Sequence, residues 1–409
     1  TAAIGGVIMN VNDEEVEEVE VDLMRQQAHM KDMMTAEDGL YAFYDLSIQE
    51  NYSVIPFKND DPINGVSTAD LVMIQRHLLG KTTFDQAYQY IAADANSSES
   101  ISASDISALR KLILGVHAEF QNNTSWRFVD AKFIFQDQTN PWLDPIPEIV
   151  IHDPLMDDEM ATNFLAVKIG DVNNDAVPHG LGGIAGSSAD FGLYTQEQVF
   201  ATGEQVSVDF FASEASSIDG MQFTLNTDGL ELLSAEAAAL NVTAAHLASI
   251  ESGVMTFSWN DVDAVSVNQG DKLFTLQFTA NTNSTIQNSV KLTSDITMAE
   301  AYVDGLNKAD MTLEVRDGQS TSDELVLYQN IPNPFSQSTT IGFELAQEAP
   351  AVLNIFDVTG KNILQVHIEG QKGYNSVDID VNQLTQAGVL YYQLESMQKV
   401  ATKRMLLVD

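Results

Sequence analysis

The sequence predicts a mainly β, multidomain protein in which three antiparallel β-sandwiches are combined with a small EF-hand-like helical module. Short segments with alternating apolar and polar residues recur along most of the 409 residues, and such alternation is typical of half-buried strands. Turn signals such as Asp38-Gly39 separate these segments. One stretch, Asn59 to Gly115, departs from this pattern, because it is written twice and has helical periodicity.

Composition shifts divide the chain into five structured segments and two linkers. The segments are a sandwich at 1–57, the helical module at 58–120, an irregular aromatic-rich extension at 121–180, a second sandwich at 190–316 and a final sandwich at 325–409. Residues 181–189, which are rich in Gly and Ser, and the short stretch 317–324 are predicted linkers.

The helical module is a tandem repeat. Asp70 and Gly80 of the first copy recur as Asp105 and Gly115, with a constant offset of 35 residues. Each copy is an oxygen-rich loop followed by a short amphipathic helix that ends at glycine. A fixed offset indicates two copies of one supersecondary unit.

The second loop has the spacing of a calcium-binding EF-hand loop. Oxygen-bearing residues occupy positions 1, 3, 5, 7, 9 and 12, namely Asp94, Asn96, Ser98, Ser100, Ser102 and Asp105. Position 6 is Glu99 instead of the usual glycine, and position 12 is Asp instead of the longer Glu. The alternative is a polar turn before an N-capped helix, since Asp, Asn and Ser favour turns and caps.

The first loop is incomplete. Counting back from Asp70 places Asn59, Asp61 and Ile63 at positions 1, 3 and 5, and isoleucine cannot bind a cation. A third half-loop near residue 171 repeats the 1, 3, 5 spacing with Asp171, Asn173 and Asp175. We expect this half-loop to return to the first loop and supply the missing oxygens; a solvated Asx turn is the alternative.

These two loop–helix units resemble the type I dockerin family, over about a sixth of the chain. The resemblance implies calcium as the bound ion and a cohesin module as the partner. In the family, the residues just before the last ligand contact the cohesin. The corresponding residues here are Thr68-Ala69 in the first copy and Ala103-Ser104 in the second.

The charge of the chain excludes several kinds of partner. With 59 acidic and 19 basic residues, the formal charge is −40, which disfavours nucleic acid and anionic membrane surfaces. No run approaches the ~18 apolar residues of a membrane span. Cysteine is absent, so stability must come from packing and metal binding.

The N-terminal segment and the extension after the helical module differ in pattern. Val19, Val21 and Leu23 alternate with acidic residues, as expected of a strand, and the Gly5 and Thr35 stretches resemble prealbumin-like repeats that act as spacers. The extension carries Trp126, Trp142 and several prolines. We interpret it as a packed cover for the helical module; a sugar-stacking platform is the alternative.

Residues 190–316 have the regular short strands of an antiparallel sandwich. Met221, Phe223 and Leu225 alternate with polar residues, and Phe257 and Trp259 do the same in a later strand. These strands, together with Gly220-Met221-Gln222-Phe223, resemble a cohesin module. The resemblance implies dockerin recognition; a generic sandwich that binds nothing is the alternative.

The last segment has the most specific motifs. Tyr328 opens the string Tyr-Gln-Asn-Ile-Pro-Asn-Pro-Phe, a strand ends at Thr359-Gly360-Lys361, and Lys403-Arg404 precedes the closing apolar residues. In order and spacing these strings resemble the type A C-terminal sorting domain of the type IX secretion system. The resemblance implies export in a Bacteroidetes bacterium and a place at the cell surface or outside the cell.

No catalytic constellation is recognisable. The seven histidines are scattered, cysteine is absent, and neither a phosphate loop nor a nucleophile elbow occurs. We therefore expect a non-catalytic, calcium-stabilised structural or adhesion protein. One alternative is the accessory tail of a polysaccharide-degrading enzyme, with polysaccharide as a partner. Another is a filament subunit whose dockerin-like and cohesin-like parts join successive copies.

Overall fold

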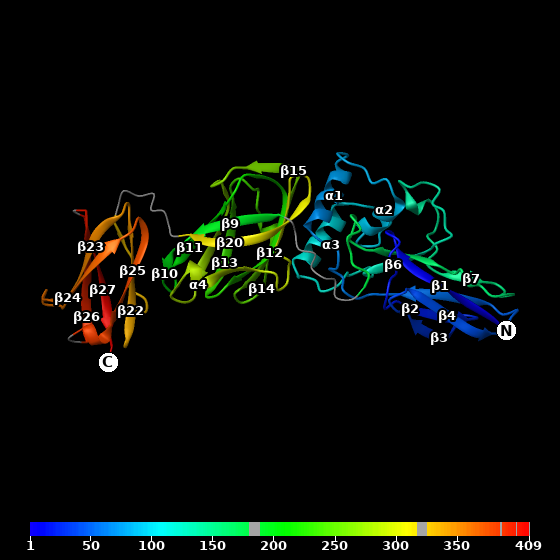
Figure 1. Ribbon diagram of the computed structural model, residues 1–409, viewed down its shortest axis with the longest axis horizontal. Coiled ribbons are helices and arrows are strands. Elements are labelled where there is room, and N and C mark those ends of the chain that lie inside the picture. Colours follow the sequence, from blue (N-terminus) through cyan, green and yellow to red (C-terminus); the bar gives the residue numbers. More distant parts are fainter. Residues whose placement is uncertain (180–188, 317–324, 385–386, 398, 409) are drawn as a thin grey trace.

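The computed structural model describes residues 1–179, 189–316, 325–384, 387–397 and 399–408. Strands dominate these residues, in several separate sheets, which confirms the predicted mainly β, multidomain class. The N-terminal region, the central domain and the C-terminal domain follow one another along the molecule (Figure 1). Of the predicted linkers, 181–189 lies outside the described residues except for its last residue, and 317–324 lies entirely outside them.

Two four-stranded sheets share one core in the N-terminal region. Their strands are β1 (Ala2–Asn10), β2 (Glu20–Arg25), β3 (Ala28–Met34), β4 (Leu40–Leu46), β5 (Tyr52–Phe57), β6 (Trp126–Asp130), β7 (Val150–His152) and β8 (Phe164–Lys168). The strand orders are β4-β1-β8-β6 and β3-β2-β5-β7.

The division between the first sandwich and the aromatic-rich extension at 121–180 differs from the prediction. Strands β6, β7 and β8 come from this extension and complete both sheets of the N-terminal region. Trp126 and Phe128 are buried in the shared core, where they replace solvent contact with apolar packing. The extension therefore returns the chain to the first domain after the helices.

Residues 64–115 form the helical unit, with helices α1 (Thr68–Leu78), α2 (Ala87–Ala93) and α3 (Ala103–Ile113). Ser67 and Ser102 cap α1 and α3, each in a capping box closed by the Asp three residues later. The apolar stripes of both helices form one core with α2, and Phe133, Phe135 and Trp142 of the extension pack onto it. These aromatic residues cover the helical unit, as we expected.

The central β domain (residues 189–316) has a ten-stranded sheet folded around one apolar core. Its strands are β9 (Asp190–Gln196), β11 (Gln205–Ala212), β12 (Ser216–Thr227), β13 (Leu230–Ala237), β14 (Leu247–Glu251), β15 (Val254–Val267), β16 (Lys272–Ala280), β18 (Val290–Thr293), β19 (Glu300–Val303) and β20 (Asn307–Arg316). Phe257 of β15 stacks on Phe274 of β16, with 5.0 Å between ring centroids, although these strands are far apart in the sheet order. The two ends of the sheet therefore face each other.

The central β domain also contains four smaller elements. They are β10 (Val199–Phe200), β17 (Ser284–Thr285), α4 (Ile286–Ser289) and the short 3₁₀ helix Ala244–His246.

A three-stranded and a four-stranded sheet share one core in the C-terminal domain. The strands are β21 (Val326–Leu327), β22 (Ser338–Leu345), β23 (Ala349–Phe356), β24 (Asn362–Gly370), β25 (Gly373–Asp380), β26 (Gly388–Ser396) and β27 (Lys399–Leu407). The fully buried Tyr392 joins this core to the motif that begins at Tyr328. Its hydroxyl donates to Tyr328 O (2.8 Å) and accepts from Asn330 N (2.8 Å).

Candidate docking interface and candidate cation loops

The helical unit lies directly against the central β domain of the same chain. Helix α1 crosses β12 and β15, and the C-terminal end of α3 contacts the same face (Figure 1). We call this contact the docking interface. It joins parts of the chain that are roughly 150 residues apart in sequence, for example Thr68 and Gln222.

The N-terminal end of α1 is the most buried part of the docking interface. Thr68 is fully buried; its N–H donates to Gln222 Oε1 (2.7 Å), and its hydroxyl bonds to Ser258 Oγ (2.9 Å). Its methyl group lies where Gly220 has no side chain, since a Cβ on Gly220 would be 2.8 Å from it. The neighbouring Ala69 is buried as well. The structure thus brings the first predicted partner-binding pair to a docking surface within the chain itself.

Charged groups anchor the C-terminal part of α1. The Arg76 guanidinium donates to Asp219 Oδ1 (2.5 Å) and to the Val262 carbonyl (3.0 Å). Asp219 is 1% exposed and also accepts the main-chain N–H groups of Gly305 (3.1 Å) and Leu306 (3.0 Å). A buried carboxylate with these partners is fully hydrogen-bonded, as a buried charge requires. At the end of α1, Lys81 forms an ion pair with Asp263.

Helix α3 contacts the interface through its last turn. The final carbonyls of a helix have no partner within the helix. Here the hydroxyls of Thr297 and Thr256 donate to the carbonyls of Ile113 (2.6 Å) and Leu114 (2.7 Å). Arg110 adds a bond to Asn260 Oδ1 (2.5 Å), and burial lowers the pKa of Arg110 to about 10.

The second predicted partner-binding pair lies away from this interface. Ala103 and Ser104 are exposed, and the Ser104 hydroxyl bonds within its own loop, to Asn96 Nδ2 (2.8 Å) and Ser102 Oγ (2.7 Å). The docking interface therefore uses α1 along its length, from Thr68 to Arg76, and the C-terminal end of α3.

The second oxygen-rich loop is held closed by two carboxylates. Asp94 accepts the N–H groups of Ser98 and Glu99, both at 2.8 Å, and Asp105 accepts those of Asn96 (3.2 Å) and Ser102 (2.9 Å). Glu99 adopts φ +59°, so it takes the left-handed conformation that glycine usually provides at position 6.

The side chains of this second loop have the composition of a cation site. The Ser98 hydroxyl bonds to the Ser100 carbonyl (3.2 Å) and hydroxyl (3.2 Å). Asn96 Oδ1 is a buried oxygen with no hydrogen-bond partner. A buried acceptor without a donor is costly, and a cation would satisfy it. The residues present therefore fit a calcium ion.

The third half-loop returns to the first loop, as the sequence analysis expected. Asp171 accepts the N–H groups of Asp175 (3.2 Å) and Ala176 (2.9 Å), which is the pattern of Asp94 in the second loop. Asp70 accepts the N–H groups of Val172 and Ser67, both at 2.9 Å.

These two distant segments together have the layout of one oxygen-rich loop, which we call the split loop. Residues 171–176 align with positions 1–6 and residues 65–70 with positions 7–12. The two segments touch where the loop would be continuous, because a Cβ on Gly65 would be 2.6 Å from the Ala176 Cβ. Asn64 and Val177 exchange two hydrogen bonds beside this point.

Two of the residues assigned to the first loop have other contacts. Asn59 Oδ1 accepts the N–H of Ser125 (2.8 Å), the residue immediately before β6. The Asp61 carbonyl accepts the N–H of Asn64 (3.1 Å) in a local turn. Asp171 and Asn173 align with positions 1 and 3 of the split loop, the positions that the sequence assigned to Asn59 and Asp61; the ligand role of all four residues stays a prediction.

The split loop concentrates negative charge in a buried place. Burial raises the pKa of Asp70 well above its ordinary value, and the charges of Asp171 and Asp175 raise it further. Burial, and then the charge of Asp175, raises the pKa of Asp171 to about 7. Lys168 lies nearby with its ammonium on the Pro62 carbonyl (3.0 Å), and burial lowers its pKa to about 8.

In the part of the chain that the structure describes, no group of three or more His, Cys, Asp or Glu side chains is arranged to hold a metal ion. A cation would therefore depend on two carboxylates in the second loop, or three in the split loop, together with amide, hydroxyl and main-chain oxygens. Calcium accepts such mixed oxygen sets, because it takes six to eight hard oxygen ligands in flexible geometry.

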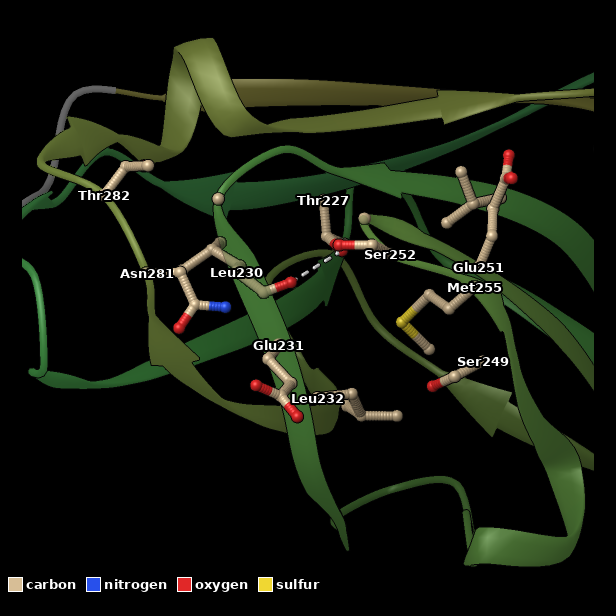
Figure 2. Close-up of a pocket in the computed structure, with 13 residues that line it drawn as sticks. Thr227, Leu230, Glu231, Leu232, Ser249, Glu251, Ser252, Met255, Asn281 and Thr282 are labelled. Carbon is tan, nitrogen blue, oxygen red and sulfur yellow. Dashed lines mark hydrogen bonds between the residues drawn. The ribbon is translucent and has the colours of Figure 1, made fainter.

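A hollow of about 600 Å³ lies where β13 begins beside the hairpin between β14 and β15 (Figure 2). The residues that line it, such as Thr227, Glu231 and Asn281, include no aromatic ring. The two tryptophans considered for sugar stacking are engaged elsewhere: Trp126 is buried in the N-terminal core, and Trp142 packs on the helical unit beside Tyr90.

Several solved structures are similar to parts of the chain. The sixth cohesin from scaffoldin B of Acetivibrio cellulolyticus, solved in complex with a Cel5 dockerin mutant, is 17% identical; the match covers 31% of this chain and 100% of that chain, with a TM-score of 0.25. The type II cohesin dyad from the ScaA scaffoldin of the same organism is 9% identical, with coverage of 52% and 96% and a TM-score of 0.22. PorZ of Porphyromonas gingivalis, a surface component of the type IX secretion system, is 16% identical, with coverage of 27% and 15% and a TM-score of 0.17.

No curated protein matches the sequence. Of the helices in the described residues, none has the length and apolar character needed to cross a membrane. Residues 330–408 match the family described as "Secretion system C-terminal sorting domain". This match confirms the predicted C-terminal sorting domain and indicates that the chain is exported.

Proposed function

We propose that this chain is a non-catalytic, calcium-stabilised structural and adhesion segment of an exported surface protein. The observation that carries the proposal is the docking interface, in which the helical unit holds the N-terminal region against the central β domain. A fixed contact of this kind suits a stalk or spacer that must keep its shape outside the cell.

The sequence resemblances suggest that this interface is a dockerin–cohesin type of contact. The helical unit resembles a dockerin and the central β domain resembles a cohesin, and Thr68 and Ala69 are the residues through which that resemblance implies docking. Here the docking is made within one chain. Assembly of copies into a filament through the same surface would first require this internal contact to open, so we favour a self-docked monomer as the working state.

Calcium bound in the split loop would stabilise the self-docked arrangement, because this loop lies next to the docking interface. Asp70 closes the split loop and lies two residues after Thr68, which docks. When bound, calcium supplies positive charge and several ligand positions for oxygens that otherwise repel one another. Asp94, Asn96, Ser98, Ser100, Ser102 and Asp105 would hold one ion, and Asp171, Asn173, Asp175 and Asp70 would hold another. Ions in both loops would fix the start of α1 and of α3.

The calcium proposal predicts a stoichiometry. In titration calorimetry of the full chain after EDTA treatment, we expect two calcium ions per chain, with affinities in the ~10⁻⁴–10⁻³ M range of extracellular modules. Asp94→Ala and the double change Asp171→Ala with Asp175→Ala should each remove one ion. Asp13→Ala, in an exposed turn, is the control and should leave two. If both loop variants bind as many ions as the unaltered chain, the assignment of these loops is wrong.

The export proposal predicts that the C-terminal domain is required for release from the cell. In a bacterium with type IX secretion machinery, the full chain behind a signal peptide should be found on the surface or in the medium. A chain that ends at Arg316, the last residue of β20, keeps the central sheet complete but should be retained, with at least tenfold less outside. Immunoblots of cell fractions measure this. Equal export of both chains would contradict the proposal.

A further inference from the structure

An apolar groove lies between two edge strands of the N-terminal region, far from the docking interface. Among the described strands, β3 and β4 each pair on one side only, β3 with β2 and β4 with β1. The groove between them has a volume of about 580 Å³. Its apolar lining comes from Met33, Met34, Leu40, Tyr44 and Met160.

The lining side chains are unusually exposed for their type. Met34 and Leu40 are 54% and 53% exposed, and Tyr44 and Met160 are 61% and 50% exposed. Contiguous exposed apolar side chains on a soluble protein mark an interaction surface. Methionine suits such a surface, because its unbranched side chain adapts to different partners.

The outward side of β4 shows what kind of partner fits. Three of its main-chain groups are met by side chains instead of a neighbouring strand. The N–H of Leu40 donates to Asp38 Oδ1 (3.1 Å), the N–H of Ala42 donates to Met33 Sδ (3.1 Å), and the Tyr44 carbonyl accepts from Lys31 Nζ (3.1 Å). A thioether is a weak acceptor, so a strand carbonyl would be a better partner for Ala42.

We propose that β4 accepts an extended segment of another protein, which adds a strand to the β4-β1-β8-β6 sheet. Main-chain bonds to Leu40, Ala42 and Tyr44 would provide affinity, and alternate apolar side chains of the segment would enter the groove. The segment carries Lys or Arg between its apolar residues, because Asp38 lines the groove and the chain has a net charge of −40. The same charge disfavours a second copy as the occupant.

The test uses the full chain and two fluorescein-labelled ten-residue peptides. In one peptide Val alternates with Lys and Thr, and in the other Glu replaces Lys. Fluorescence anisotropy should show saturable binding of the basic peptide and at least tenfold weaker binding of the acidic one. Hydrogen exchange should show new protection of the amides of residues 40–46 when the basic peptide is bound.

Two substitutions distinguish strand addition from non-specific hydrophobic binding. Ala42→Pro removes an N–H that points away from β1, so the fold should survive, while binding should fall at least tenfold. Leu40→Ser should have a similar effect. Its control is Leu233→Ser, which removes an equally exposed leucine (52%) from another edge strand and should leave binding unchanged.

Several results would overturn the proposal. These are no saturable binding of either peptide, equal binding of both peptides, or equal losses with Leu40→Ser and Leu233→Ser. A concentration-dependent dimer of the full chain in light scattering, abolished by Ala42→Pro, would show that a second copy is the occupant and that the proposed partner is wrong.

Discussion

Replacing Thr68 with arginine is expected to release the helical unit from the central β domain. Thr68 is fully buried between Gln222, Ser258 and Gly220, and the space beside Gly220 is too small for a long side chain. An arginine held there would lose its hydration and displace the hydrogen bonds of Thr68 to Gln222 and Ser258, which costs several kcal/mol. Each hydrogen bond of the interface contributes only roughly 1 kcal/mol, so the contact should not survive.

Small-angle scattering should detect the release as an increase in the maximum dimension of the full chain. Hydrogen exchange should also become faster in the parts of β12 and β15 that α1 covers. Ala103→Arg is the matched control, because Ala103 is the repeat equivalent of Thr68 but is exposed. It should change neither measurement. An unchanged scattering profile for Thr68→Arg, or the same change for both variants, would show that the docking interface does not hold the two parts together.

The sequence pattern was sufficient for features encoded within a few residues. The tandem repeat predicted both loop–helix units, and each Asp at the twelfth loop position is also the closing residue of a capping box. The second loop is contiguous, so its spacing could be read directly. The string beginning at Tyr328 identified the sorting domain for a similar reason, since its motifs lie in a fixed order.

Features formed by distant segments were harder to predict. The assignment of Asn59 and Asp61 assumed a contiguous loop, whereas residues 171–176, about a hundred residues later, lie beside Asp70 in the structure. The only sequence signal for this contact was the Asp171, Asn173 and Asp175 triplet, which has loop spacing but no helix after it. Strands β6 and β8 were missed because a short strand buried on both faces lacks the alternation that marks a half-exposed strand.

The docking interface was also hard to predict, because its two surfaces come from segments far apart in the sequence. The repeat and its family resemblance indicated which residues of α1 could meet a partner, and Thr68 of that pair lies against the central β domain. Nothing in local spacing could indicate that Arg76, Arg110 and Ile113 would bond to Asp219, Asn260 and Thr297, because those partners occur in three separate strands or loops of another domain.

The stability of the split loop should depend on pH in a direction opposite to that of most carboxylates. In the folded chain without metal, burial and Asp175 raise the pKa of Asp171 to about 7, against about 3.9 in an unfolded chain. Between these values the folded state retains a proton that the unfolded state has lost, so stability falls as the pH rises. The slope is at most about 1.4 kcal/mol per pH unit for one group, and Asp70 acts in the same direction.

In EDTA, the free energy of opening α1, measured by hydrogen exchange corrected for intrinsic rates, should therefore decrease from pH 5 to pH 8. Millimolar calcium should offset most of this loss at pH 8 and have little effect at pH 5, because protonated carboxylates bind the ion poorly. Asp171→Asn should flatten the dependence in EDTA, whereas Asp13→Asn should not. A pH-independent free energy in EDTA would mean that the buried carboxylates do not titrate in this range. An equal slope for Asp171→Asn and the unaltered chain would assign the titration to other groups, and the link between cation binding and the start of α1 would be lost.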